Sequence, residues 1–187
     1  ESVDTHARTK DPQCVDLICD RECYADICEA AKRSGNAFVI GYVKLLIDTI
    51  NLKTFVRARK MGQPWSFFGT VFISGGDISE KVFVSGYEEP VAQFAARLEG
   101  TALKKAAEEG LASMKETGSF TDIERLCDDA LMDYVKDAKC ISFGIEPLIA
   151  YMAAKQAEIR CVRIVLAGKA AGLAPNLIRE RLRETYG

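Results

Sequence analysis

One long stretch, residues 37–61, constrains the fold of this chain more than any other part of its sequence. Apolar and charged residues recur along it at helical spacing. Gly62, followed two residues later by Pro64, is a strong stop signal for a helix. The pattern therefore predicts a single long helix that ends close to Met61.

The polar residues of this predicted helix form two stripes instead of one. The stripes are Lys44, Asp48, Asn51 and Arg59 on one side and Lys53, Arg57 and Lys60 on the other. The flanks between them are apolar, with Leu45, Leu52 and Val56 on one and Ile47, Ile50 and Ala58 on the other. An ordinary surface helix has a single apolar stripe, so we expect this one to pack between neighbours on two flanks.

The rest of the chain also reads as helical. Spacing and stop signals predict further helices over residues 12–32, 65–72, 79–84, 90–98, 101–115, 121–139, 147–170 and 175–186. Residues 121–124 have the sequence of a capping box, and the aromatic patch at 65–72 is interpreted as core. The best strand candidate, residues 82–84, is short. We therefore expect an all-α fold without a substantial sheet.

A weak internal repeat divides the chain. Cys19 aligns with Cys127 at a shift of 108 residues, and Leu52 aligns with Ile159 at a shift of 107. An acidic helix, a turn, a long helix, a basic end and a glycine break follow in the same order in both copies. We expect a frayed tail over residues 1–10, helical unit A over 11–118 and helical unit B over 119–187, the two units forming one continuous helical assembly.

Composition excludes several classes of function. A net charge of -2 gives no overall field for nucleic acid or for an anionic membrane. The longest uncharged stretch, residues 61–76, is broken by glycines and a proline, whereas a membrane span needs about 20 apolar residues in helical register. The chain opens at Glu1 without a methionine, so we expect it to be part of a longer protein, although a processed start would give the same sequence.

The cysteines do not form a recognisable metal site. Their number, seven, is odd, which argues against a disulfide framework. In one predicted helix Cys19 and Cys23 share a face, while Cys14 and Cys28 lie nearly opposite, so the four cannot surround a tetrahedral zinc ion. We interpret them as reduced cysteines that act as small hydrophobic residues.

Residues for catalysis are equally scarce. The only histidine, His6, lies in the tail, which leaves little from which to build a Ser-His-Asp or Cys-His arrangement. The run from Gly168 to Gly172 follows a helix instead of a strand and has the wrong order for a phosphate-binding loop. We therefore expect no catalytic residue, no cofactor and no bound metal.

The remaining signal is charge placed for a partner. Basic residues gather at the ends of both long helices, and the candidate interface consists of Lys53, Arg57, Arg59, Lys60, Arg160, Arg163 and Lys169. Arginine is favoured in such interfaces because its planar guanidinium binds carboxylates in a bidentate manner. These residues could instead pair with the acidic helices of the same molecule, and both alternatives stay open.

Two groups of residues resemble the C subunit of prokaryotic V-type (A-type) rotary ATPases, a relative of the d subunit of eukaryotic V-type ATPases. The first group is Asp11-Pro12, Val15-Asp16, Cys19-Asp20-Arg21 and the run from Ile47 to Arg59. The second is Glu146-Pro147-Leu148-Ile149, Glu158-Ile159-Arg160, Gly168-Lys169, Gly172-Leu173 and the run from Ile178 to Arg183. Family members are longer, so this chain would be about the C-terminal two thirds.

The resemblance implies repeated helical units that form part of a funnel with pseudo-threefold symmetry. Its wide mouth would seat the central shaft, made of the D and F subunits, and its narrow end would rest on the membrane rotor ring. Such a protein is a non-catalytic, peripheral component on the cytoplasmic face, which transmits torque in a proton- or sodium-translocating ATPase. The alternative is a free-standing α-helical adaptor that binds acidic protein partners.

Overall fold

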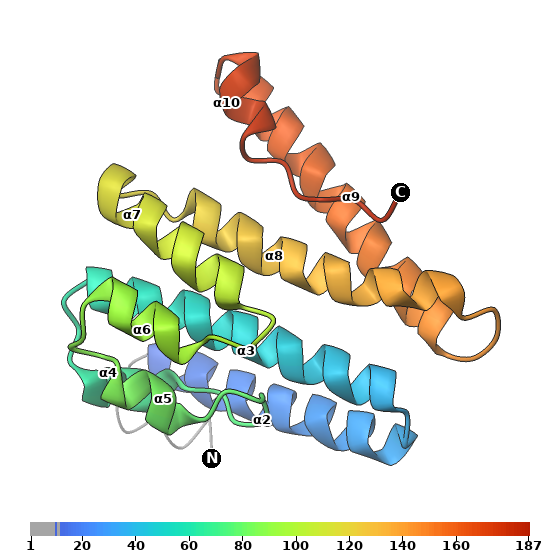
Figure 1. Ribbon diagram of the computed structural model, residues 1–187, viewed down its shortest axis with the longest axis horizontal. Coiled ribbons are helices and arrows are strands. Elements are labelled where there is room, and N and C mark those ends of the chain that lie inside the picture. Colours follow the sequence, from blue (N-terminus) through green and yellow to red (C-terminus); the bar gives the residue numbers. More distant parts are fainter. Residues whose placement is uncertain (1–9, 11) are drawn as a thin grey trace. The chain divides into compact units, whose positions relative to one another are not determined.

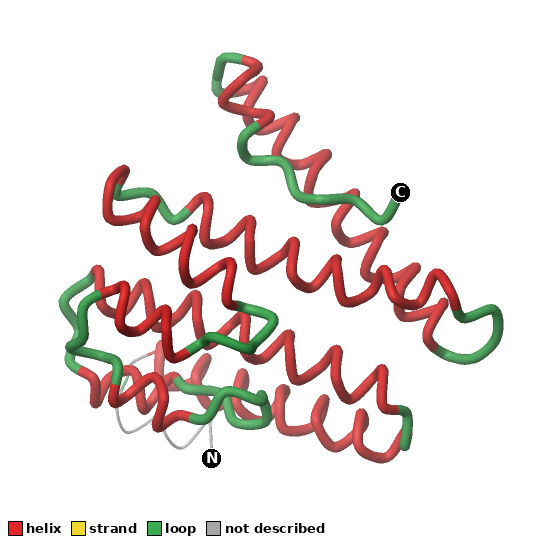
Figure 2. The backbone as a smooth tube through the Cα atoms, viewed as in Figure 1, coloured by secondary structure: helices red, strands yellow, loops and turns green. Residues whose placement is uncertain are grey.

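A computed structural model describes residue 10 and residues 12–187 (Figures 1 and 2). The predicted tail, apart from Lys10, and with it His6, lies outside the described residues. Every regular element in the described part is a helix, which confirms the all-α class. The elements are α2 Pro12–Ser34, α3 Ala37–Lys60, α4 Trp65–Val71, α5 Glu80–Ser85, α6 Val91–Arg97, the π-helix η1 Ala106–Gly110, α7 Leu111–Thr117, α8 Thr121–Lys136, the 3-10 helix η2 Asp137–Cys140, α9 Glu146–Ala170 and α10 Pro175–Arg179.

The chain folds as two compact units. Unit 1 ends at Glu89, and unit 2 comprises Pro90–Gly187. The sequence repeat placed a boundary between residues 118 and 119 instead. That boundary separates two sequence repeats and does not refer to compact units. It stays a prediction.

Unit 1 is built on a hairpin of two long helices, α2 and α3 (Figure 1). Gly35 supplies the left-handed conformation of the turn between them, with φ of 64°. Asn36 then caps α3, because its side-chain oxygen accepts a hydrogen bond of 3.1 Å from the Val39 amide. Ala31, Val43, Ile47 and Ile73 form the buried cluster between the helices and the loop that follows α4.

Aromatic side chains fill the core on another side of α3. Phe55 lies at the centre, with its ring centroid 5.5 Å from Phe68, 5.4 Å from Phe83 and 5.4 Å from Tyr87. All four residues are buried. The patch predicted as core is therefore core at Phe68 but not at Trp65, which stays 55% exposed.

Unit 2 is organised around α8, which contacts η1, α7 and α9. The predicted helix over residues 101–115 is confirmed in part, as η1 followed directly by α7. η1 ends at Gly110, where a Cβ atom would lie 2.8 Å from the backbone Cα of Ile123 in α8. The missing side chain thus permits a very close crossing of the two elements.

The capping box predicted for residues 121–124 does not form. Phe120 occupies the N-cap position without a side-chain hydrogen bond, and Thr121 is already helical. The hydroxyl of Ser119 instead accepts a hydrogen bond of 3.2 Å from the Thr121 amide. The turn before α8 therefore binds the Thr121 amide, which the Glu124 side chain would have bound in a capping box.

The prediction of a helix over residues 175–186 is wrong beyond Arg179. A turn at residues 180–181 follows, and the chain then continues without regular secondary structure. It binds α8 through a contact of 2.8 Å between Arg183 Nε and Asp128 Oδ2. The Glu184 amide also donates to Asp129 at 2.8 Å. These contacts with the acidic helix outweigh the local helical preference of the terminal residues.

Candidate partner interface

The first polar stripe of α3 holds the loop between α4 and α5. Asp48 accepts hydrogen bonds from the amides of Asp77, at 3.0 Å, and Ile78, at 3.1 Å. Asn51 binds both backbone groups of Ile73, donating to its carbonyl at 2.8 Å and accepting from its amide at 3.0 Å. Asp48 and Asn51 are 4% and 1% exposed. These two side chains therefore recognise the loop through its backbone.

Two glycines allow this close approach. A Cβ atom on Gly76 would overlap Oδ1 of Asp48, and one on Gly75 would lie 2.6 Å from the Cys28 sulfur. Gly75 also has φ of 116°, a conformation that other residues rarely adopt. The Gly-Gly pair thus lets the loop lie against Cys28 of α2 and Asp48 of α3.

Burial changes the acidity of Asp48. Loss of solvent raises the pKa of its carboxyl group from 3.8 to about 6, although the amides of Ile78 and Asp77 act in the opposite direction. The charge of Asp77 raises this pKa further and that of Lys44 lowers it, while Lys44 itself binds Asp77 at 2.8 Å.

We expect Asp48→Asn to lower the free energy of unfolding by about 1–3 kcal/mol, because one loop amide loses its acceptor. The folded protein holds the Asp48 proton more tightly than the unfolded chain does. Wild-type stability therefore falls as pH rises from about 4 to about 6, and the variant lacks this fall. The difference between the two proteins should narrow by roughly 2 kcal/mol over that range.

Chemical denaturation at several pH values measures this difference. Asp77→Asn is the matched control: Asp77 is 68% exposed at its side chain, and its loss should keep most of the pH dependence, because burial is the main cause of the raised pKa of Asp48. Parallel stability curves for wild type and Asp48→Asn would contradict the assignment.

The predicted basic residues of α3 have different environments. Arg59 is half-buried: its Nη2 donates to the Glu89 carbonyl at 2.7 Å, and its guanidinium lies 5.4 Å from the Phe55 ring centroid. It therefore braces the end of unit 1. Lys53 is half-buried, while Arg57 and Lys60 are exposed.

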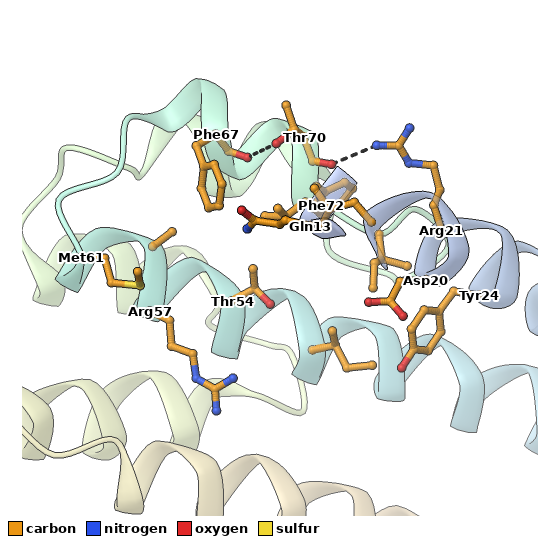
Figure 3. A pocket seen from close by; sticks show the side chains of 15 residues that line it. Gln13, Asp20, Arg21, Tyr24, Thr54, Arg57, Met61, Phe67, Thr70 and Phe72 are labelled. Atoms are coloured by element: carbon orange, nitrogen blue, oxygen red, sulfur yellow. Dashed lines mark hydrogen bonds between the residues drawn. The ribbon is translucent and has the colours of Figure 1, made fainter. Parts of the chain in front are cut away.

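Arg57 borders an open groove between α2, α3 and α4 (Figure 3). The groove has a volume of about 330 Å³. Arg21 crosses from α2 to donate to the Thr70 carbonyl at 2.9 Å, which ties α2 to α4 beside it. In Figure 3 the Arg57 guanidinium points away from Phe67 and Thr70.

The basic residues of α9 also divide into two kinds. Arg160 binds Asp128 Oδ2 at 2.6 Å, the same oxygen that Arg183 contacts, and so it serves unit 2 internally. Arg163 and Lys169 are exposed, and neither side chain forms a hydrogen bond or ion pair with the described residues. The structure thus brings Arg160 to the acidic helix and leaves Arg163 and Lys169 facing solvent.

Sequence reasoning missed the structural role of Asp48 and Asn51. They were placed on a polar stripe, which is usually solvated, yet both are buried. A signal was present in the glycine pair at 75–76. A glycine-rich loop beside a helix that carries isolated polar residues marks a place where backbone can approach side chain.

The structure offers no alternative site for a metal ion or a membrane span within the described residues. No group of three or more His, Cys, Asp or Glu side chains in that part of the chain is arranged to hold a metal. None of the described helices is long and apolar enough to cross a bilayer.

The described part of the chain is an all-α protein. The chain matches the family described as "ATP synthase (C/AC39) subunit" over residues 1–181, and it is a member of that family. This confirms the family indicated by the sequence motifs.

Curated relatives carry matching names. The chain is 25% identical to the C subunit of the V-type sodium ATPase of Enterococcus hirae over 93% of its own length and 52% of the relative's. It is 26% identical to the C subunit of the A-type ATP synthase of Methanothermobacter thermautotrophicus, over 75% of this chain and 38% of that one. The chain thus spans about half the length of the relatives it matches, less than the two thirds expected. No solved structure matches it.

Proposed function

We propose that this chain acts as a non-catalytic rotor coupling component of a V/A-type rotary ATPase. In this role it seats the central shaft, made of the D and F subunits, on the membrane rotor ring and transmits torque for ATP-linked ion transport. The observation that carries the proposal is the family match over residues 1–181, together with relatives named as the C subunit of such complexes.

The internal ties of unit 1 suit a part that bears load. Asp48 and Asn51 fasten the loop after α4 to α3, and Arg59 fastens the segment after α5 at Glu89. Each tie joins residues more than 20 positions apart in sequence. Force applied to the loop would therefore pass directly to the long helix.

The proposed arrangement is the one implied by the resemblance to C subunits of V/A-type ATPases. Repeated helical units form part of a funnel with pseudo-threefold symmetry, and the protein sits as a peripheral component on the cytoplasmic face of the membrane. Its partner contacts are the exposed Arg57 and Lys60 with Lys53 in unit 1, and the exposed Arg163 and Lys169 in unit 2. Arg59 in unit 1 and Arg160 in unit 2 support these two groups through their contacts with Glu89 and Asp128.

Co-purification tests the function. The natural protein that contains this chain, tagged and expressed with its genomic neighbours, should retain the shaft proteins and the rotor ring through purification. Recovery as a monomer bound only to soluble acidic proteins, without an ATPase, would favour the alternative of a free-standing helical adaptor.

Charge reversal tests the interface. We expect Arg57→Glu and Arg163→Glu each to reduce recovery of the complex at least tenfold. Both positions are exposed, and the introduced carboxylates would repel an acidic partner. Their free energy of unfolding should stay within about 1 kcal/mol of wild type, as for most surface changes. Lys115→Glu, an equal change at an exposed position of α7, is the control. Equal losses of stability and assembly would identify these arginines as internal struts.

A further inference from the structure

The helix α9 carries its large apolar residues on the outside. Its buried residues are all small: Ala150, Ala154 and Gly168. At Gly168 a Cβ atom would lie 2.7 Å from Ile178, so the inner face admits only a small residue there. A helix that served only its own unit would show the reverse distribution. The outer face of α9 is therefore built for contact with something else.

The outer residues follow a regular spacing. Successive steps of three and four residues connect Ile145, Leu148, Met152, Lys155, Ile159, Val162, Leu166 and Lys169. The apolar members are 41%, 57%, 53%, 53%, 57% and 63% exposed in that order. A repeat of three and four is the signature of a seam that packs along a second helix. We call this set of eight residues the α9 seam.

Charge at the α9 seam is mainly positive. Lys155 and Lys169 occupy two of its positions, and Arg163 flanks it. The nearby anion Glu158 is already bound to Lys155, at 2.7 Å. Two copies of the seam would bring an excess of positive charge together, whereas a helix with acidic flanks would neutralise it.

The internal repeat indicates that the exposed face of α9 is covered by another segment. At the shift of 107 residues, Val162 corresponds to Phe55 and Leu166 to Arg59. In unit 1 this face of α3 is covered, since Phe55 packs against α4 and α5 and Arg59 binds Glu89. In unit 2 the described chain after α9 packs on Gly168 through Ile178 and binds α8 through Arg183, but it leaves Val162 and Leu166 exposed. The same face is thus covered in one unit and bare in the other.

We propose that the α9 seam docks one amphipathic helix of a partner protein, with apolar residues in the same three-and-four repeat and acidic residues on its flanks. The helix lies along α9, its apolar residues packing between Leu148 and Leu166 while its carboxylates meet Arg163 and Lys169. This inference rests on the proposed function, because it names the kind of segment that the α9 part of the interface binds.

A designed peptide tests the inference on the chain itself. The probe is a labelled helix with Leu at the seam positions and Glu on both flanks, and its twin carries Lys on the flanks. Fluorescence anisotropy should show saturable binding of the acidic probe, at least tenfold tighter than that of the basic twin and weakened by added salt. Ile159→Gln combined with Val162→Gln should reduce the affinity at least tenfold.

Leu177→Gln is the matched control, because Leu177 is 43% exposed but lies in α10, outside the α9 seam. Binding of the acidic probe that survives the seam substitutions would overturn the inference, as would equal binding of both probes. Self-association of the chain that the same substitutions abolish would assign the seam to a second copy. If the acidic peptide does not bind but the protein co-purifies with the ATPase, only this inference is overturned. If the peptide binds but the protein does not co-purify with an ATPase, only the proposed function is overturned.

Discussion

Replacing Phe55 with alanine should lower the free energy of unfolding of unit 1 by about 3–5 kcal/mol, which is typical for loss of a buried aromatic side chain. Phe55 is completely buried, and its ring contacts three other aromatic rings. Those rings come from α4, α5 and the segment after α5, so Phe55 joins all three segments to α3. The substitution leaves a cavity that rigid neighbours cannot close, and it also removes the ring beneath Arg59.

Chemical denaturation followed by circular dichroism measures this effect. Phe143→Ala is the control, because Phe143 is 91% exposed and its loss should change stability by less than about 0.5 kcal/mol. A loss below about 1 kcal/mol at Phe55 would mean that the aromatic cluster collapses around the gap.

Gly110→Val should destabilise unit 2 by more than about 3 kcal/mol, because overpacking against backbone has no cheap relief. The first added atom would already lie 2.8 Å from Cα of Ile123, and Ile123 is itself buried in α8. Only a movement of α8 away from η1 can make room. That movement would open the contact on which this end of unit 2 depends.

Ala112→Val provides the comparison, because Ala112 is exposed in α7. The lower helix propensity of valine should reduce the free energy of unfolding by only about 0.5 kcal/mol. Hydrogen exchange of α8 amides should rise in Gly110→Val before the unit unfolds as a whole. Unchanged exchange and stability would show that the two elements are farther apart than the structure indicates.

Sequence reasoning was successful where local signals agree with tertiary contacts. α3 ends at Lys60, one residue before the predicted end, because the stop at Gly62 and Pro64 acts on the backbone directly. The helices α2 and α9 were found by the same rules. Pseudo-threefold symmetry and the partner contacts of the basic residues stay predictions.

The errors share a physical cause, which is contact over long distances in sequence. Residues 180–186 have a helical pattern, but Arg183 and Glu184 bind carboxylates that lie 55 positions earlier. Asp48 and Asn51 were placed on a polar stripe without a partner for either, yet a loop some 22 to 30 residues later covers them. No window of local sequence contains both members of such a pair.

Backbone recognition of the loop after α4 has a practical consequence for watching this protein move. Asp48 and Asn51 bind backbone amides and a carbonyl, so these hydrogen bonds do not depend on the exposed side chain of Ser74. A fluorescent non-natural amino acid at Ser74 would therefore be held close to α3 without disturbing these hydrogen bonds. Such a reporter would follow the orientation of unit 1 during turnover of the motor that we propose.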